Sequence, residues 1–90
     1  MILEIVSPEA KLFSGEITSI TLPGVDGSFQ ILNNHAPIVS ILEKGVLKIV
    51  TSSTNENLTK FNKVDGQTYT LNINSGTIEM KDNKVIVLVD

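Results

Sequence analysis

Short apolar runs rich in valine, isoleucine and threonine recur along this 90-residue chain, and glycine, asparagine, aspartate or proline interrupts them about every ten residues. The pattern is typical of strands joined by turns, because β-branched side chains suit extended backbone and the interrupting residues suit turns. We therefore predict an all-β fold, a small β-sandwich or flattened barrel of about 8–10 short, mostly antiparallel strands. A chain of this length forms a single domain over residues 1–90.

The turn residues set the expected strand boundaries. Pro8 closes the first strand, and Pro23 with Gly24 closes one that begins at Glu16. A tight turn at Asp82 and Asn83 joins the clearest pair into a hairpin. The expected strands are Ile2–Ser7, Glu16–Leu22, Phe29–Leu32, Val46–Thr51, Leu58–Phe61, Tyr69–Ile73, Thr77–Lys81 and Lys84–Val89.

Three stretches carry further expectations. Along Val46–Thr51, residues 46, 48 and 50 (Val, Lys, Val) alternate with Leu47 and Ile49, so we expect both faces of that strand to be partly buried. The polar segment Thr51–Asn57 is expected to be the most mobile connection. Residues 37–45 have helical apolar spacing after Pro37, but their β-branched side chains favour a loop followed by a strand, which we predict.

Charge and composition exclude several classes of protein. A formal net charge of -3, with seven lysines and no arginine, argues against nucleic-acid binding, since phosphate recognition relies on clustered basic side chains. The absence of cysteine excludes disulfides and cysteine-rich zinc sites. The longest apolar run, Val85–Val89, is far shorter than the ~20 residues that cross a bilayer. We expect no nucleic-acid partner and no direct membrane insertion.

The single histidine, His35, lies between two asparagines and an Ala–Pro pair. Nucleophilic catalysis needs a base beside the nucleophile and usually a third orienting group, and no carboxylate has a distinctive spacing to His35. One histidine and scattered acidic residues also give no metal-ligand pattern. We predict no catalytic residue, metal, cofactor or small-molecule substrate. Pro37 restricts the backbone after Ala36, which favours His35 as a structural or interface residue in a defined loop.

An alternative function involves Lys81. Swinging-arm carrier domains are all-β units of similar size with a modified lysine at a hairpin tip, and Met80–Lys81 precedes the predicted turn. The biotinyl pattern has alanine and methionine where this chain has Glu79 and Asp82, and the lipoyl pattern has aspartate before the lysine. A carrier domain modified at Lys81 stays the second hypothesis.

Residues 27–45 read GSFQILNNHAPIVSILEKG. They match the pattern G-x-(F/L)-x-I-L-x-x-H-A-P-(L/I)-x-x-x-L-x-x-G, and the chain thereby resembles the N-terminal β-sandwich domain of the epsilon subunit of bacterial F-type ATP synthases. The opening strand with Phe13-Ser14-Gly15 and the closing segments around Ser75–Met80 and Val85–Val89 are also similar to this family. The resemblance covers nearly the whole chain.

The resemblance implies a rotor subunit that docks on the gamma subunit and on the polar loops of the c-ring, and that couples proton-driven rotation to ATP synthesis. It implies a peripheral location at the cytoplasmic face of the bacterial inner membrane. The gamma-facing residues carried over are Ser7, His35 and Ser40. The c-ring-facing loop is Asp26, Gly27 and Ser28, with Asn33 and Asn34 nearby.

The chain departs from the family pattern in two places. Residues 52–66 are longer and more polar than the usual connection. Family members commonly continue into a C-terminal helical hairpin that can restrain rotation or sense nucleotide, whereas this sequence ends at Asp90, with the last matching strand. An inhibitory role is therefore not implied.

Overall fold

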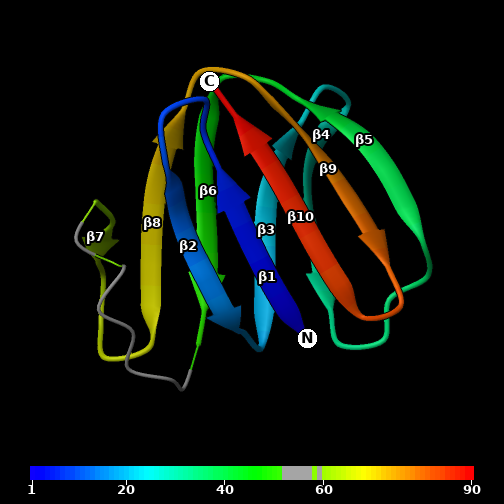
Figure 1. Cartoon of the computed structure of the whole chain (residues 1–90), viewed down its shortest axis with the longest axis horizontal. Helices are drawn as coiled ribbons and strands as arrows, with labels where there is room; N and C mark the ends of the chain where they lie inside the picture. The colour runs from blue at the N-terminus through cyan, green and yellow to red at the C-terminus, as the bar shows by residue number, and fades with distance from the viewer. Residues whose placement is uncertain (52–57, 59) are drawn as a thin grey trace.

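A computed structural model describes residues 1–51, 58 and 60–90 (Figure 1). Ten strands follow one another along these residues, which confirms the predicted all-β fold, and no helix there has the length and apolar character needed to cross a membrane. The strands are β1 (Ile2–Val6), β2 (Lys11–Glu16), β3 (Ser19–Gly24), β4 (Gly27–Leu32), β5 (Ile38–Leu42), β6 (Gly45–Val50), β7 (Asn62–Lys63), β8 (Thr68–Ile73), β9 (Gly76–Lys81) and β10 (Lys84–Val89).

The strands form two layers that curl into a half-barrel (Figure 1). The front sheet has the order β2-β1-β10-β9-β5, and the back sheet has the order β4-β3-β6-β8-β7. Paired strands are antiparallel among the described residues except β1 and β10, which are parallel. The two sheets meet where Gly24 of β3 pairs with Leu42 of β5.

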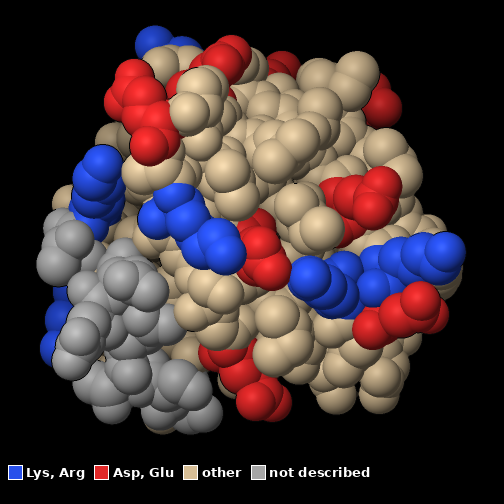
Figure 2. All heavy atoms as spheres, viewed as in Figure 1, with Lys and Arg blue, Asp and Glu red and all other residues tan. Residues whose placement is uncertain are grey.

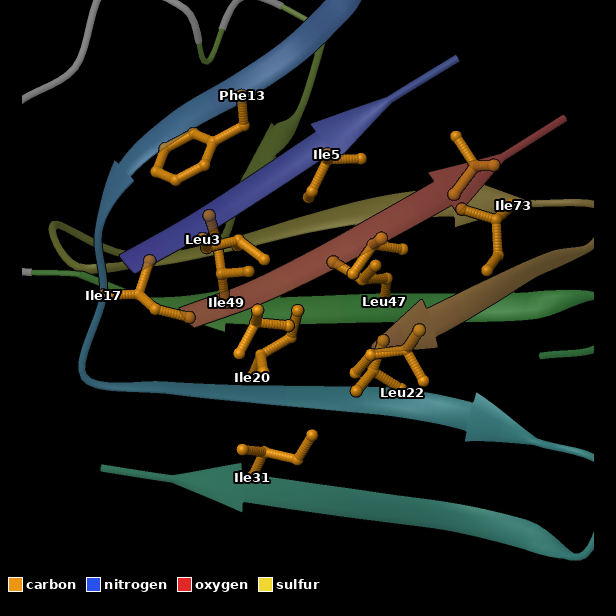
Figure 3. Close-up of a cluster of buried hydrophobic side chains, with 14 of the residues drawn as sticks. Leu3, Ile5, Phe13, Ile17, Ile20, Leu22, Ile31, Leu47, Ile49 and Ile73 are labelled. Carbon is orange, nitrogen blue, oxygen red and sulfur yellow. The ribbon is translucent and has the colours of Figure 1, made fainter. Parts of the chain in front are cut away.

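The core fills the space between the sheets and is mainly aliphatic (Figure 3). Alternate residues of each strand point inward because successive side chains of a strand face opposite sides. Leu3 and Ile5 of β1 face Leu47 and Ile49 of β6 across the core, and all four are fully buried. Phe13 of β2 closes one end of this core.

Two predicted elements are confirmed. The hairpin of β9 and β10 turns at Asp82 and Asn83, whose φ angles of 52° and 60° are those of a tight turn with two left-handed residues. Ile78 and Met80 are buried together on its inner face, as the pattern predicted. Residues 38–42 form a strand rather than a helix, because β5 pairs with β9 along its whole length.

The strand predicted at Glu16–Leu22 is wrong in its boundaries. Glu16 ends β2, and β3 begins only at Ser19 and continues through Pro23. The Pro23 carbonyl accepts a hydrogen bond from the N–H of Glu43 at 2.9 Å, so its backbone polar groups point toward the β5–β6 turn. Pro23 pairs with Ser28 of β4, but its carbonyl faces the opposite side. On that side β3 pairs with β6 only as far as Thr21 and with β5 only at Gly24, so proline at this position removes no ladder hydrogen bond.

Three other expectations differ from the structure or concern residues outside the described ones. The strand predicted at Leu58–Phe61 is replaced by β7, since a 3.1 Å hydrogen bond from the Phe61 N–H to the Leu58 carbonyl closes a turn there; residue 59 lies outside the described residues. One face of β6 is buried at Leu47 and Ile49, and the other is exposed at Val46 and Lys48 and half-buried only at Val50. The mobile connection predicted for Thr51–Asn57 lies outside the described residues except Thr51, which is buried.

Candidate functional site

His35 lies exposed in the loop between β4 and β5. Its Nδ1 is 2.7 Å from the Ala36 carbonyl oxygen, which makes Nδ1 the protonated nitrogen, and its backbone N–H donates to Leu32 at 3.2 Å. A backbone carbonyl therefore holds the ring, where a catalytic dyad would use a carboxylate. Among the described residues, no three histidine, cysteine or acidic side chains gather closely enough to hold a metal ion.

An asparagine cluster, consisting of Asn33, Asn34 and Asn83, fixes this loop. The backbone N–H of Asn34 donates to Asn83 Oδ1 at 2.8 Å, and Asn83 Nδ2 donates to Asn33 Oδ1 at 3.0 Å. The Asn83 carbonyl also accepts from the N–H of Ile2 at 3.1 Å. Asn83 thus joins the His35 loop, the β9–β10 turn and the start of β1. Sequence reasoning used Asn83 only as a turn residue, because the pairing spans about fifty positions.

Replacing Asn83 with glycine should release the loop while keeping the turn, since glycine accepts the positive φ. We expect amide exchange at Asn34 to accelerate about fivefold, which corresponds to the loss of one hydrogen bond of about 1 kcal/mol. Exchange measured by NMR tests this. Asp82→Gly, the same kind of change one position earlier, is the control and should leave Asn34 exchange as it is. Equal acceleration in both variants would show that the turn, not the side chain, holds the loop.

Ser7 and Ser40 border the front sheet at separate places. Ser7 closes the turn after β1: its N–H donates to the Ala10 carbonyl at 2.9 Å, and its Oγ accepts from the Ala10 N–H at 3.2 Å. Ser40 lies half-buried in the middle of β5, opposite Ile78 of β9. His35 lies in the loop before the first residue of β5. Ser7, His35 and Ser40 therefore lie apart, after β1, before β5 and within β5, and do not form a cluster.

The outer face of the front sheet carries a cross-strand row, defined as Val6, Leu88, Thr77 and Ile41. These residues are direct partners on four neighbouring strands, so their side chains project from the same face. Ile41 is 63% exposed and Leu88 51%, and the neighbouring Val39 of β5 is 77% exposed. Figure 2 shows the uncharged area that covers this part of the front sheet.

A groove of about 530 Å³ lies over the cross-strand row. The turn after β1, the end of β5, the start of β9 and the end of β10 all contribute to it. Its lining residues are Val6, Ser7, Pro8, Ile41, Leu42, Ser75, Gly76, Thr77, Leu88, Val89 and Asp90. An exposed, mostly apolar face of this kind is typical of a protein-interaction surface.

The outer face of the back sheet is different. Its central row consists of Thr21, Lys48 and Thr70, which are cross-strand partners and are polar. Leu32 and Val46 are exposed apolar residues of this sheet. Their cross-strand partners, Ser19 for Leu32 and Asn72 for Val46, are polar. On the outer face of the front sheet, Val6 and Leu88 adjoin each other across strands, and Thr77 lies between Leu88 and Ile41.

Charged side chains border the cross-strand row on the front sheet. The Glu4 carboxylate lies 3.3 Å from Lys84 Nζ and 3.6 Å from Lys11 Nζ. The hydrogen bond from Lys84, followed by the positive charge of Lys11, holds the pKa of Glu4 below its usual value. Because these groups are solvent-exposed, the pairs contribute little to stability and instead fix the charge pattern beside the apolar area.

The predicted c-ring-facing residues fall into two groups. Asp26, Gly27 and Ser28 form the exposed tip of the β3–β4 hairpin, where Gly27 has a φ of 119°. Asn33 and Asn34 follow the far end of β4 and contact Asn83. The six residues of β4 separate the groups by roughly 17 Å, so the structure does not bring them together.

The comparisons with known proteins all point to one family. The family described as "ATP synthase, Delta/Epsilon chain, beta-sandwich domain" matches residues 1–90. The ATP synthase epsilon chain of Chlorobium limicola is 35% identical over 88 residues, which are 98% of this chain and 86% of that one. The epsilon chain of Campylobacter fetus is 42% identical over 98% of this chain. This chain spans 59% of the Campylobacter fetus protein and 56% of the Pelotomaculum thermopropionicum epsilon chain.

A solved structure of the central stalk and c-ring of the Tetrahymena thermophila mitochondrial ATP synthase contains a chain of the same fold. Its TM-score is 0.75 at 23% identity, over 98% of this chain and 61% of that one. The family match confirms the resemblance read from the sequence and the prediction of a non-catalytic subunit, and it leaves the carrier alternative at Lys81 without support. The chain therefore belongs to the family of ATP synthase delta/epsilon chain β-sandwich domains.

Proposed function

We propose that this chain is a rotor subunit of a proton-translocating F-type ATP synthase, which docks on the gamma subunit and the c-ring and couples proton-driven rotation to ATP synthesis. The observation that carries the proposal is the exposed cross-strand row of the front sheet with the groove above it. The complex would hold the chain peripherally at the cytoplasmic face of the bacterial inner membrane.

The outer face of the front sheet is the side that we assign to gamma. Of the three residues that the family resemblance implies, Ser7 follows β1 and lines the groove, and His35 precedes β5. Ser40 lies within β5, but its partner Ile78 is buried, so its side chain faces inward. A stable protein interface buries about 800 Å² on each partner and concentrates its energy in a few central side chains. Ile41 of β5 and Leu88 of β10 supply exposed apolar side chains on this outer face.

The tip of the β3–β4 hairpin is the part that we assign to the c-ring. It is exposed, it carries the acidic side chain of Asp26, and it belongs to the back sheet, so a second partner can contact it without displacing the first. Asn33 and Asn34 are assigned to holding the His35 loop, because Asn83 binds both of them.

Coupling by such a subunit is mechanical. Torque passes through a domain without loss only if the domain is stiff, and closely packed interiors have low compressibility. Here the core is continuous from β1 through β6 between the two sheets. The domain therefore transmits force between its two faces without a chemical step of its own.

Ile41→Asp tests the gamma-facing assignment, since it places a charge in the apolar area without disturbing the core. We expect binding to the purified gamma subunit of the same enzyme to weaken about 10- to 100-fold, or on the order of 1.4–3 kcal/mol. Titration calorimetry or surface plasmon resonance measures it.

Val64→Asp is the matched control, because Val64 is also 63% exposed but lies in the turn between β7 and β8. It should bind gamma as the unchanged chain does. Thermal unfolding of both variants establishes that each is folded. Unaltered affinity in a folded Ile41→Asp variant would contradict the assignment of this face to gamma.

A further inference from the structure

Strand β5 has an unpaired edge. It pairs with β9 from Ile38 to Leu42 on one side, whereas on the other side its ladder pairing is confined to Leu42, which meets Gly24 of β3. Every second residue of Ile38–Ile41 therefore directs its backbone N–H and carbonyl away from β9. These groups lie at the border of the front sheet, where a further strand can be added (Figure 1).

No charged residue, proline or bulge interrupts β5, and Pro37 lies directly before its first residue. Natural edge strands are blocked by charges, prolines or bulges, and β2, the opposite edge of the same sheet, has Lys11, Glu16 and a bulge in its pairing with β1. β5 reads Ile-Val-Ser-Ile-Leu, without a charge. Its Val39 and Ile41 are among the most exposed apolar side chains of the described residues.

Two hollows adjoin β5 on its outer face. The groove above the cross-strand row touches Ile41 and Leu42, and a second hollow of about 350 Å³ touches Pro37, Ile38 and Val39. Glu79 and Lys81 border the second hollow. β4, the uncharged edge of the back sheet, lines neither hollow. A strand beside β5 would place alternate side chains on the same outer face as Val39 and Ile41, next to these hollows.

We infer that β5 accepts an added β-strand from the gamma subunit, an extended, uncharged segment with apolar side chains at alternate positions. This inference rests on the proposed function and deepens it, since Val39 and Ile41 belong both to this edge and to the gamma-facing area. The backbone pairing fixes the register of the partner, and the apolar side chains fill the two hollows.

A second copy of this chain fits the edge less well. An edge of five residues is about 16 Å long and covers only a small fraction of the roughly 800 Å² per partner that a stable dimer buries. A gamma strand gains the remaining area because the same partner covers the adjoining outer face. We therefore assign the edge to a segment of the gamma subunit.

Removal of single backbone N–H groups tests the inference while leaving every side chain in place. Val39, Ser40 and Ile41 are replaced one at a time by their α-hydroxy acid analogues, which convert the amide to an ester. Esters whose N–H faced β9 should lower the stability of the free domain. Esters whose N–H faced the open edge should leave that stability unchanged and weaken gamma binding about 3- to 10-fold, as loss of one hydrogen bond does.

The outcomes separate this inference from the proposed function. An ester at Phe13 in β2 provides the control, since β2 is the protected edge of the same sheet. Gamma binding that is unaffected by all three β5 esters overturns strand addition and leaves docking on the outer face standing. Absence of gamma binding by the unchanged chain overturns both. Self-association of the free chain that the open-edge esters abolish would assign the edge to a second copy and overturn the inference.

Discussion

Replacing Phe13 with alanine is expected to lower the free energy of unfolding by about 3–5 kcal/mol, the usual cost of removing a buried aromatic ring. Phe13 is 1% exposed, and its ring meets that of Phe61 edge to face, with centroids 6.2 Å apart and planes at 64°. This pair contributes beyond its buried area because the ring edge of one faces the π-surface of the other. Small domains have total stabilities of about 5–15 kcal/mol, so this one change removes a large part.

Urea unfolding followed by circular dichroism measures the loss. Phe29→Ala is the control, because it makes the same chemical change at a ring in β4 that is only partly buried. Its cost should be clearly smaller. Equal losses at the two positions would contradict the view that the Phe13–Phe61 contact closes the core.

Gly76→Ala is expected to destabilise the domain by about 3 kcal/mol, at the upper end of the range for added bulk in a packed site. An added Cβ would overlap the carbonyl oxygen of Leu88 on the neighbouring strand. That atom belongs to the backbone of β10, which pairs on both sides, so it cannot move without disturbing the sheet.

Gly66→Ala should have the opposite sign. No heavy atom lies within 4 Å of a Cβ built at Gly66, and its backbone is outside the left-handed region. Alanine there restricts the unfolded chain and should stabilise by about 0.4–1 kcal/mol. Thermal unfolding of the two variants provides the comparison. A neutral Gly76→Ala variant would refute the close approach of β9 and β10 at this position.

Local signals predicted some elements correctly and others not. The Asp82–Asn83 turn and the buried pair Ile78 and Met80 depend only on neighbouring residues, and both were predictable. The prediction that Pro23 ends a strand is wrong. A proline fits inside β3 because neither β6 nor β5 pairs with β3 at this residue, and the sequence near Pro23 does not show that. The position of β7 was missed for the same reason, since a two-residue strand is defined by its partner β8 and not by its own pattern.

The candidate site shows the same division. The family motif in residues 27–45 identified the relevant loop and its histidine from the sequence. It did not show that Asn83 holds this loop. The cross-strand row was also not predictable, because its four residues come from four strands whose order in the sheet differs from their order in the chain.

The sequence by itself determined the all-β class, the closing hairpin, the family and the absence of an assembled catalytic pattern, because composition, turn chemistry and a contiguous motif are local properties. Only the tertiary structure decided which apolar residues remain exposed. Val39, Ile41 and Leu88 are as apolar as their buried neighbours, and strand register alone turns them outward. The exposed apolar row of the front sheet and the open edge of β5 follow from that register and from the pairing of residues far apart in the chain.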